Sequence, residues 1–231
     1  MTGGSLSIVI PVLDEARGIA AALAALGRLR EQGAEVVVVD GGSRDDTRSL
    51  AGAQCDRVVE APRGRGAQMN AGAHAARGEF LVFLHADTRL PADGERAIHA
   101  ALARGEWGRF DVAIEGADRL LALVETTMNL RSRLTGIATG DQAIFVRRAA
   151  FDAVGGFPEI ALMEDVELCK RLRRRSRPVC LRERVTTSAR RWRRHGTLRT
   201  IFLMWRLRLA YALGADPRRL ARRYDAERSS S

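Results

Sequence analysis

Residues 6–15 read LSIVIPVLDE and residues 35–47 read EVVVVDGGSRDDT, and these two stretches indicate the fold class. Each is a short apolar run that ends at acidic residues, as expected for a strand buried on both faces of a parallel sheet. The alanine- and leucine-rich residues 16–30 between them predict a connecting helix. Residues 79–84 (EFLVFL) repeat the pattern after a helix predicted over residues 66–77. Strands that alternate with helices in this way predict an α/β fold with a mostly parallel sheet flanked by helices.

The second half of the chain has a looser pattern of strands and helices. Strands are predicted there over residues 107–115, 142–147 and 178–186, and helices over residues 117–133, 164–175, 197–213 and 217–226. We expect one α/β domain over residues 1–196, followed by a helical, basic C-terminal extension over residues 197–231.

Positive charge is concentrated at the C-terminal end of the chain. The 38 Lys and Arg residues outnumber the 28 Asp and Glu residues, which gives a net charge of +10. From Lys170 to Ser231 there are 20 cations and 4 anions, whereas the first 169 residues carry 18 cations and 24 anions. A uniformly basic chain would favour a nucleic-acid binder. A mildly acidic body with a basic tail does not, so we expect no nucleic-acid partner.

The cysteines and the N-terminal segment indicate where the protein works. Cys55, Cys169 and Cys180 are odd in number and lack the C-x-x-C spacing, so neither a disulfide framework nor a structural zinc is expected. The first apolar run has no basic residues before it and is interrupted by Pro11, which favours a strand over a signal peptide. We therefore expect a cytoplasmic protein, and peripheral contact with the inner membrane face stays open.

Three predicted strands are followed by loops that carry acidic residues. These loops contain Asp14 and Glu15, Asp40 to Asp46, and His85 to Asp87. Any one of them could simply cap a helix. Three at the same sheet edge favour a site for a cation and a phosphorylated ligand, because ligands of parallel sheets bind beyond the carboxyl ends of the strands. Asp87 would suit Mg²⁺ or Mn²⁺, whereas His85 could be a second ligand, a ribose contact or a polar filler.

Two further segments are candidates for binding and catalysis. Residues 63–72 (RGRGAQMNAG) form neither a Walker loop nor the dinucleotide fingerprint, but glycines and arginines before a helix can hold a diphosphate. A flexible surface turn is the alternative. Residues 164–167 (EDVE) begin a predicted helix, where carboxylates favour the helix dipole. The functional alternative is a general base that takes the proton of a sugar hydroxyl.

Taken in order, these segments resemble the family 2 glycosyltransferases of the GT-A fold, the Rossmann-like fold of nucleotide-diphospho-sugar transferases. The resemblance covers roughly residues 5–196 and rests on SIVIPVLDE, VVVVDGGSRDDT, RGRGAQMNAG, LHADTRLP, GGFPE, the Glu-Asp pair at 164–165 and RRWRRHG. With the ARRWRRHG segment included, the sequence is most similar to the bacterial rSAM/selenodomain-associated transferase 2 group. Some of that group are described as arsenosugar-biosynthesis glycosyltransferases.

The resemblance implies a role for each matching residue on the donor side. Asp40 would contact the base of the donor, and Asp87 would bind the metal. The remaining donor-binding residues implied are Pro11, Glu15, Arg65, His85 and Arg191. Two positions depart from the family pattern: Gly41 replaces the second acid of Asp-Asp-Gly-Ser, and His85 replaces the first acid of Asp-x-Asp.

On the acceptor side, the resemblance implies that Asp165 is the catalytic base. Glu164 and Trp192 would line the acceptor site, and His195 would point at the metal or the diphosphate. Arg191 and Trp192 resemble the end of the Q-x-x-R-W motif, with Ser188 in place of the glutamine.

The implied reaction is a single displacement with inversion at the anomeric carbon. It would use a nucleoside-diphosphate sugar, with a UDP-sugar favoured, a divalent cation (Mn²⁺ or Mg²⁺), and a small-molecule or lipid-linked acceptor. A sugar-1-phosphate nucleotidyltransferase is the alternative enzyme, but residues 11–20 lack the glycine-rich loop and lysine that it needs. A non-enzymatic basic module would leave the acids at 40, 87 and 165 unexplained.

Residues 198–213 are apolar almost all round their predicted helix. A helix of this kind can pack on the domain or against a second subunit, or it can lie at an anionic membrane surface. Packing on the domain or in a homodimer is favoured over peripheral membrane contact.

Overall fold

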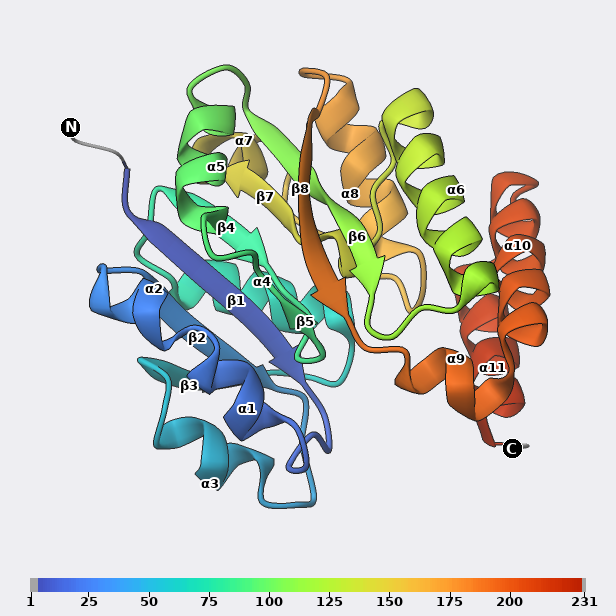
Figure 1. The fold of residues 1–231 in the computed structure, drawn as a ribbon, viewed down its shortest axis with the longest axis horizontal. Coiled ribbons are helices and arrows are strands. Elements are labelled where there is room, and N and C mark those ends of the chain that lie inside the picture. The colour runs from blue at the N-terminus through green and yellow to red at the C-terminus, as the bar shows by residue number, and fades with distance from the viewer. Residues whose placement is uncertain (1–3, 230–231) are drawn as a thin grey trace.

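The computed structural model describes residues 4–229, which form one sheet with helices on both faces (Figure 1). The eight strands of the sheet run in the order β3-β2-β1-β4-β7-β6-β8-β5. Their bounds are β1 Leu6–Val12, β2 Glu35–Asp40, β3 Arg57–Glu60, β4 Phe80–Phe83, β5 Thr88–Arg89, β6 Trp107–Ile114, β7 Ile144–Arg147 and β8 Val179–Thr187.

The helices connect these strands and continue beyond the last one. They are α1 Ile19–Ala24, α2 Gly27–Glu31, α3 Thr47–Gly52, α4 Arg65–Ala75, α5 Gly94–Leu102, α6 Arg119–Thr135, α7 Arg148–Ala153, α8 Glu164–Arg173, α9 Arg190–His195, α10 Thr197–Ala212 and α11 Pro217–Ser229, with a 3₁₀ turn, η1, at Gly140–Gln142.

The sheet is mixed and mostly parallel, which confirms the predicted fold class. Strands β3, β2, β1 and β4 are parallel, β7 runs antiparallel between β4 and β6, and β8 is parallel to β6. Alternate residues of β2 point to opposite faces: Val36 and Val38 lie in one apolar cluster and Val37 and Val39 in the other. Both faces are thus covered, as the unbroken apolar run predicted.

Three short elements were not expected from the sequence, and one expected helix is interrupted. The helix predicted over residues 16–30 is divided into α1 and α2, because the Leu26 N–H donates to the carbonyl of Leu23 in a tighter turn just before Gly27. The unexpected elements are β5, α7 and α9, which have two, six and six residues. Elements of this length are too short to carry a recognisable hydrophobic period.

The last two helices pack against the body of the protein. Leu207 of α10 and Leu220 of α11 form an apolar cluster with Leu162 and Met163, which precede α8. Ile201 of α10 packs against a second cluster that includes Leu121 and Val124 of α6, and α6 and α10 lie side by side in Figure 1. Among residues 4–229, no helix combines the length and apolar character needed to cross a membrane.

Candidate active site

The loops after β1 and β2 interlock at the carboxyl edge of the sheet. The Asp14 N–H donates to Ser43 Oγ (2.9 Å), and the Arg44 N–H donates to Asp14 Oδ1 (2.8 Å). The Glu15 N–H donates to Thr47 Oγ1 (2.8 Å). Asp14 has a φ of +53°, a left-handed conformation that few residues other than glycine adopt. These hydrogen bonds hold the two loops against each other at the carboxyl end of the sheet.

Asp40, the predicted contact to the donor base, is 1% exposed. Its carboxylate accepts from the backbone N–H groups of Gly42 (3.1 Å) and Ser43 (3.0 Å) and from the Ser43 hydroxyl. The structure therefore places Asp40 at the expected loop, with its carboxylate shaping that loop. Direct contact with a nucleotide base stays a prediction.

Gln68 of α4 is a structural residue at this edge that the sequence did not single out. Its Nε2 donates to the carbonyls of Val12 and Val39, at 2.8 Å each, and so joins the ends of β1 and β2. A Cβ at position 41 would lie 3.0 Å from the Gln68 amide. This close approach leaves little room for a side chain at position 41. The only signal in the sequence was the place of Gln68 within the RGRGAQMNAG segment.

Arg65 begins α4 and faces the start of α8. Its Nη1 lies 4.0 Å from Glu164 Oε1, and 38% of its side chain is exposed. Desolvation lowers the pKa of Arg65, but the negative charges of Glu164, Asp141 and Asp165 among its neighbours more than offset this and leave the pKa raised. The guanidinium thus stays charged at the place where the sequence predicted a diphosphate contact.

The loop before β7 brings His85 and Asp165 together. His85 Nδ1 lies 3.3 Å from Asp141 Oδ1, and the neighbouring Gly140 N–H donates to Asp165 Oδ2 (3.0 Å). A Cβ at position 140 would collide with His85 Nε2. Asp141 was missed in the sequence, although it ends the glycine- and threonine-rich loop over residues 135–141. Two residues here have an unusual backbone conformation. Ala143, just before β7, and Met163, just before α8, have φ values of +45° and +71°.

Glu164 and Asp165 open α8 and have different surroundings. Glu164 is 5% exposed, and burial, followed by the charge of Asp165, raises its pKa. Asp165 is half-buried, and its Oδ1 accepts from the Val166 N–H (2.7 Å). A half-buried carboxylate that is held by backbone donors can accept a proton from a bound hydroxyl.

Asp87 lies in the loop between β4 and β5. The Thr88 hydroxyl lies 3.5 Å from its Oδ1, and its carbonyl accepts from the Ser188 N–H (3.0 Å) just before α9. Within the described residues, no group of three or more His, Cys, Asp or Glu side chains is close enough to hold a metal ion. Asp87 by itself offers one hard oxygen ligand, of the kind that Mg²⁺ and Mn²⁺ accept beside phosphate oxygens.

Helix α9 brings the basic segment to this edge. Arg190 Nη2 forms an ion pair with Glu15 Oε2 (3.1 Å), which links α9 to the loop after β1. Trp192 packs in the cluster that contains Leu121 and Val124 of α6. Its predicted contact with the acceptor stays a prediction. The side chains of Arg191 and His195 lie outside the described part of the structure, and Pro11 is a half-buried residue near the end of β1.

Arg131 of α6 is a further charged group near the site that the sequence did not indicate. Its Nη2 is buried without a hydrogen-bond partner in the described structure. Burial, followed by the charge of Arg208 on α10, lowers its pKa to about 10, while the charge of Asp165 acts in the opposite direction. The predicted base is therefore in electrostatic contact with a partly buried cation.

The fold belongs to the GT-A class of glycosyltransferase folds, as comparison with solved structures confirms. The mannosyltransferase from Pyrobaculum calidifontis in complex with GDP-Man and Mn²⁺ matches with a TM-score of 0.65 and 21% identity over 90% of this chain and 61% of that one. S. aureus TarS 1-349 in complex with UDP-GlcNAc matches with a TM-score of 0.64 and 18% identity over 80% and 58% of the two chains. Glucosyl-3-phosphoglycerate synthase from Mycobacterium tuberculosis, in complex with Mn²⁺, UDP and glucosyl-3-phosphoglycerate, matches at 0.61 and 19% over 80% and 71%.

Comparison with known sequences shows which glycosyltransferase family the first part of the chain resembles. Residues 7–114 match the model of the family described as glycosyl transferase family 2. Over 106 residues the chain is 33% identical to uncharacterized glycosyltransferases of Mycobacterium tuberculosis and Mycobacterium bovis, a region that covers 46% of this chain and 47% of each relative. The chain thus spans about half the length of the curated relatives it matches. The family 2 likeness predicted from the sequence is confirmed for the half of the chain that carries β1 to β6.

Proposed function

We propose that this protein transfers a sugar from a nucleoside-diphosphate sugar to the hydroxyl group of an acceptor. The observation that carries the proposal is the meeting of Asp165, Glu164, Arg65 and His85 at the carboxyl edge of the sheet. This edge is where ligands of such sheets bind. The match of residues 7–114 to family 2 supports the same reaction class.

The donor is proposed to lie across the interlocked loops after β1 and β2. Arg65 is charged and partly exposed there, so it can pair with a diphosphate. Two of the proteins with this fold, TarS and glucosyl-3-phosphoglycerate synthase, are known in complex with UDP-GlcNAc and with UDP. The mannosyltransferase is known with GDP-Man. We favour a UDP-sugar as the donor of this chain.

We propose that the site uses a divalent cation, Mn²⁺ or Mg²⁺. Asp87 would hold it, with His195 as the proposed second ligand, and diphosphate oxygens and water would complete its shell. When bound, the cation would offset the negative charge that develops on the departing diphosphate. Arg65 contributes to the same stabilisation from the protein, because its charge is already in place before the bond breaks.

Asp165 is the proposed general base. Its carboxylate is held by the Gly140 N–H and would take the proton of the acceptor hydroxyl as that oxygen attacks the anomeric carbon. The bond from the anomeric carbon to the diphosphate oxygen breaks at the same time, so the configuration inverts. Glu164 has a raised pKa and holds its proton more tightly than an ordinary glutamate. It would line the acceptor side, together with Trp192.

The location of the protein, its domain bounds and its acceptor are also proposals that come from the sequence. We propose a cytoplasmic protein with residues 1–196 as the catalytic domain, acting on a small-molecule or lipid-linked acceptor and not on nucleic acid. The ARRWRRHG segment further supports membership of the rSAM/selenodomain-associated transferase 2 group.

A thermal-shift screen of nucleotides and nucleotide sugars, with and without Mn²⁺, tests the proposal. UDP, UDP-GlcNAc, UDP-glucose and GDP-mannose are the first ligands to screen. A specific donor at a hundredfold excess over its Kd should raise the Tm by about 5–10 °C. Asp87→Asn should lose the Mn²⁺-dependent part of this rise, and the exposed Asp46→Asn should keep it. Tight binding of labelled RNA, with no rise for any nucleotide, would overturn the proposal.

A further inference from the structure

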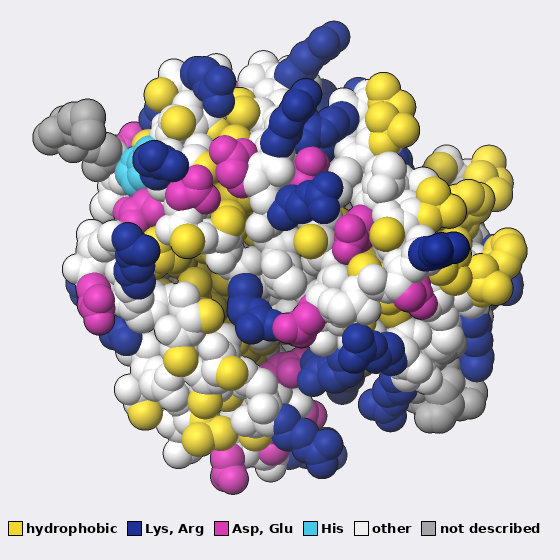
Figure 2. All heavy atoms as spheres, viewed as in Figure 1, with side chains coloured by type: hydrophobic (Ala, Val, Ile, Leu, Met, Phe, Trp, Pro, Cys, Tyr) yellow, Lys and Arg dark blue, Asp and Glu magenta, His cyan; other side chains and the backbone are white. Residues whose placement is uncertain are grey.

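Two neighbouring helices carry nearly all of the exposed large hydrophobic side chains. Among the described residues nine such side chains are exposed; seven of them lie on α6 and α10, and an eighth, Leu213, directly follows α10. We call these eight the outer strip: Leu123, Leu130, Leu134, Leu198, Phe202, Trp205, Leu209 and Leu213, which are 55–79% exposed. Figure 2 shows hydrophobic side chains gathered along the edge of the molecule where α6 and α10 lie. An apolar surface concentrated in this way marks an interaction site.

The part of the strip that α10 carries is one face of this helix. Leu198, Phe202, Trp205 and Leu209 recur at intervals of four, three and four residues, which is the repeat of a single helix face. The opposite face of α10 includes Leu203 and Leu207, and it packs on α11 and on the loop before α8. The fold therefore uses one apolar face of α10 and leaves the other exposed.

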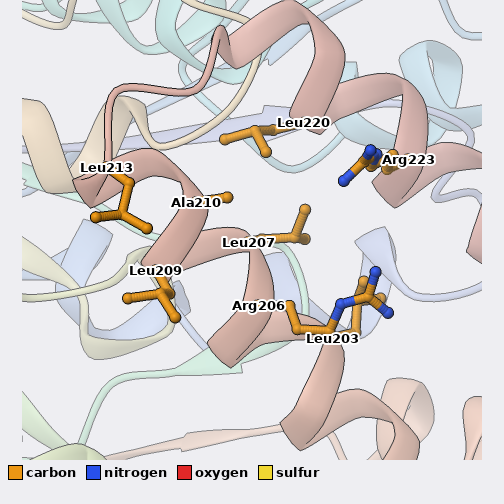
Figure 3. Close-up of a pocket in the computed structure, with 8 residues that line it drawn as sticks. All are labelled: Leu203, Arg206, Leu207, Leu209, Ala210, Leu213, Leu220 and Arg223. Atoms are coloured by element: carbon orange, nitrogen blue, oxygen red, sulfur yellow. The ribbon is translucent and has the colours of Figure 1, made fainter.

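A groove between α10 and α11 adjoins the strip (Figure 3). Its volume is about 210 Å³, and most of its lining is leucine and alanine. Figure 3 shows the guanidinium groups of Arg206 and Arg223 toward one end of the groove, with Leu209 and Leu213 toward the other. Both arginines are exposed. A groove with cations at one end and apolar side chains at the other fits a molecule with an anionic head and an acyl chain.

The surrounding charge distinguishes between the candidate occupants of the strip. Residues 197–229, which include α10 and α11, carry eight cations and three anions. A two-fold dimer would place the same surface of two copies face to face, so that its arginines would oppose one another. An anionic bilayer would instead attract them, and each basic residue near such a surface contributes about 1 kcal/mol.

We propose that the outer strip and the adjoining groove dock this protein on an anionic phospholipid bilayer. Phe202 and Trp205 enter the boundary between headgroups and acyl chains, and Arg206 and Arg223 contact lipid phosphates. Aromatic and leucine side chains on one helix face with arginines at its edge are typical of helices that lie in the interface plane. The inference is independent of the proposed glycosyl transfer.

Vesicle co-sedimentation of the full chain tests the docking. We expect binding to vesicles of phosphatidylcholine mixed with phosphatidylglycerol, and much weaker binding to phosphatidylcholine alone. The double variant Phe202→Ser/Trp205→Ser should lose roughly a hundredfold or more of the partition coefficient, because each of the two large apolar side chains contributes about 1.5–3 kcal/mol when buried. The matched control is Leu50→Ser, the one exposed large hydrophobic residue of the described structure outside the strip. It should bind as the wild type does.

Two further measurements keep the proposal falsifiable. Arg206→Ser and Arg223→Ser should each weaken binding to the mixed vesicles by about fivefold, the factor that corresponds to roughly 1 kcal/mol per basic residue. Thermal melts should show that all variants fold, since the replaced side chains are exposed. A wild-type dimer in sedimentation velocity that becomes monomeric in Phe202→Ser/Trp205→Ser, with no vesicle binding by either protein, would overturn the proposal and assign the strip to a second copy of the chain.

Discussion

Two groups of carboxylates lie at the same edge of the sheet, and their surroundings are opposite. In the loop after β2, Asp45 accepts from Thr47 Oγ1 and from the N–H groups of Thr47 and Ala16, and these hydrogen bonds, that of the Thr47 hydroxyl first, lower its pKa. At the start of α8, burial raises the pKa of Glu164, and the charge of Asp165 raises it further. Carboxylates whose oxygens already accept several hydrogen bonds keep a loop in its conformation. Buried carboxylates with a second negative charge beside them are suited to proton transfer. We therefore propose a structural role for the first group and a role in the reaction for the second.

Among changes that leave every charge in place, the largest effect is expected in the second group. In Gly140→Ala the new Cβ would displace the His85 ring, disturb its contact with Asp141, and shift the N–H that holds Asp165. A misplacement of this kind costs roughly a hundredfold in kcat. Steady-state kinetics should show this loss. Gly52→Ala, whose nearest non-bonded atom would lie 3.9 Å away, should retain full activity. Equal activity in the two variants would contradict the assignment.

The first group should respond in stability. Asp40→Ala leaves the N–H groups of Gly42 and Ser43 without their acceptor, and we expect a loss of about 2–3 kcal/mol in the free energy of unfolding. Urea denaturation measures this directly. The exposed Asp46→Ala is the control and should remain within about 0.5 kcal/mol of the wild type. If Asp40→Ala were as stable as its control, the loop would not depend on this carboxylate.

The effect of pH on stability through Glu164 is a further test of how the two groups of carboxylates differ. Because the folded state raises its pKa above 4.5, the folded state binds the proton more tightly than the unfolded state does. The contribution of Glu164 to the free energy of unfolding is therefore fully present below pH 4.5. It is lost as the pH rises through the pKa that Glu164 has in the folded state. Glu164→Gln should be more stable than the wild type at neutral pH and lose this advantage in acid.

Thermal melts across the acidic to neutral range measure this difference. Glu159→Gln, at an exposed position, should show no pH-dependent difference from the wild type. A wild type that gains stability relative to Glu164→Gln as the pH rises would reverse the sign and contradict burial as the cause.

The smallest effect is expected at the link between the first group and the basic tail. Arg190 is 57% exposed in its ion pair with Glu15, so a double-mutant cycle of Arg190→Gln and Glu15→Gln should give a coupling of about 0.2–1 kcal/mol. The coupling should decrease with added salt. A salt-independent coupling well above this range would show that α9 is fixed more firmly than its exposure indicates.

Much of the N-terminal half was predictable, because its signals are local. The strand at residues 35–40 forms as its apolar run indicated, since the run stops at an acid and a turn. The two-residue β5 could not be predicted, because it exists only through pairing with β8, 99 residues away at Thr88 and Thr187. The split between α1 and α2 comes from the tighter turn in which the Leu26 N–H donates to the Leu23 carbonyl.

The candidate site was predictable only in part. Arg65, His85 and Asp165 stand in segments whose order and spacing indicated them. Asp141 meets His85 across 56 positions of the chain, and only the antiparallel insertion of β7 between β4 and β6 brings the two together. The sequence likewise predicted an apolar helix over residues 198–213, but which face stays exposed depends on how α10 packs on α8 and α11.

The most direct test of the account is a paired measurement on Asp165→Asn. With the donor found in the thermal-shift screen, turnover and nucleotide affinity are measured on the same preparation. We predict that turnover decreases by about 10²–10⁴, the contribution of a general base, while nucleotide affinity stays nearly unchanged. A folded Asp165→Asn protein that retains turnover, or that loses nucleotide binding, would contradict the role of Asp165 as the base.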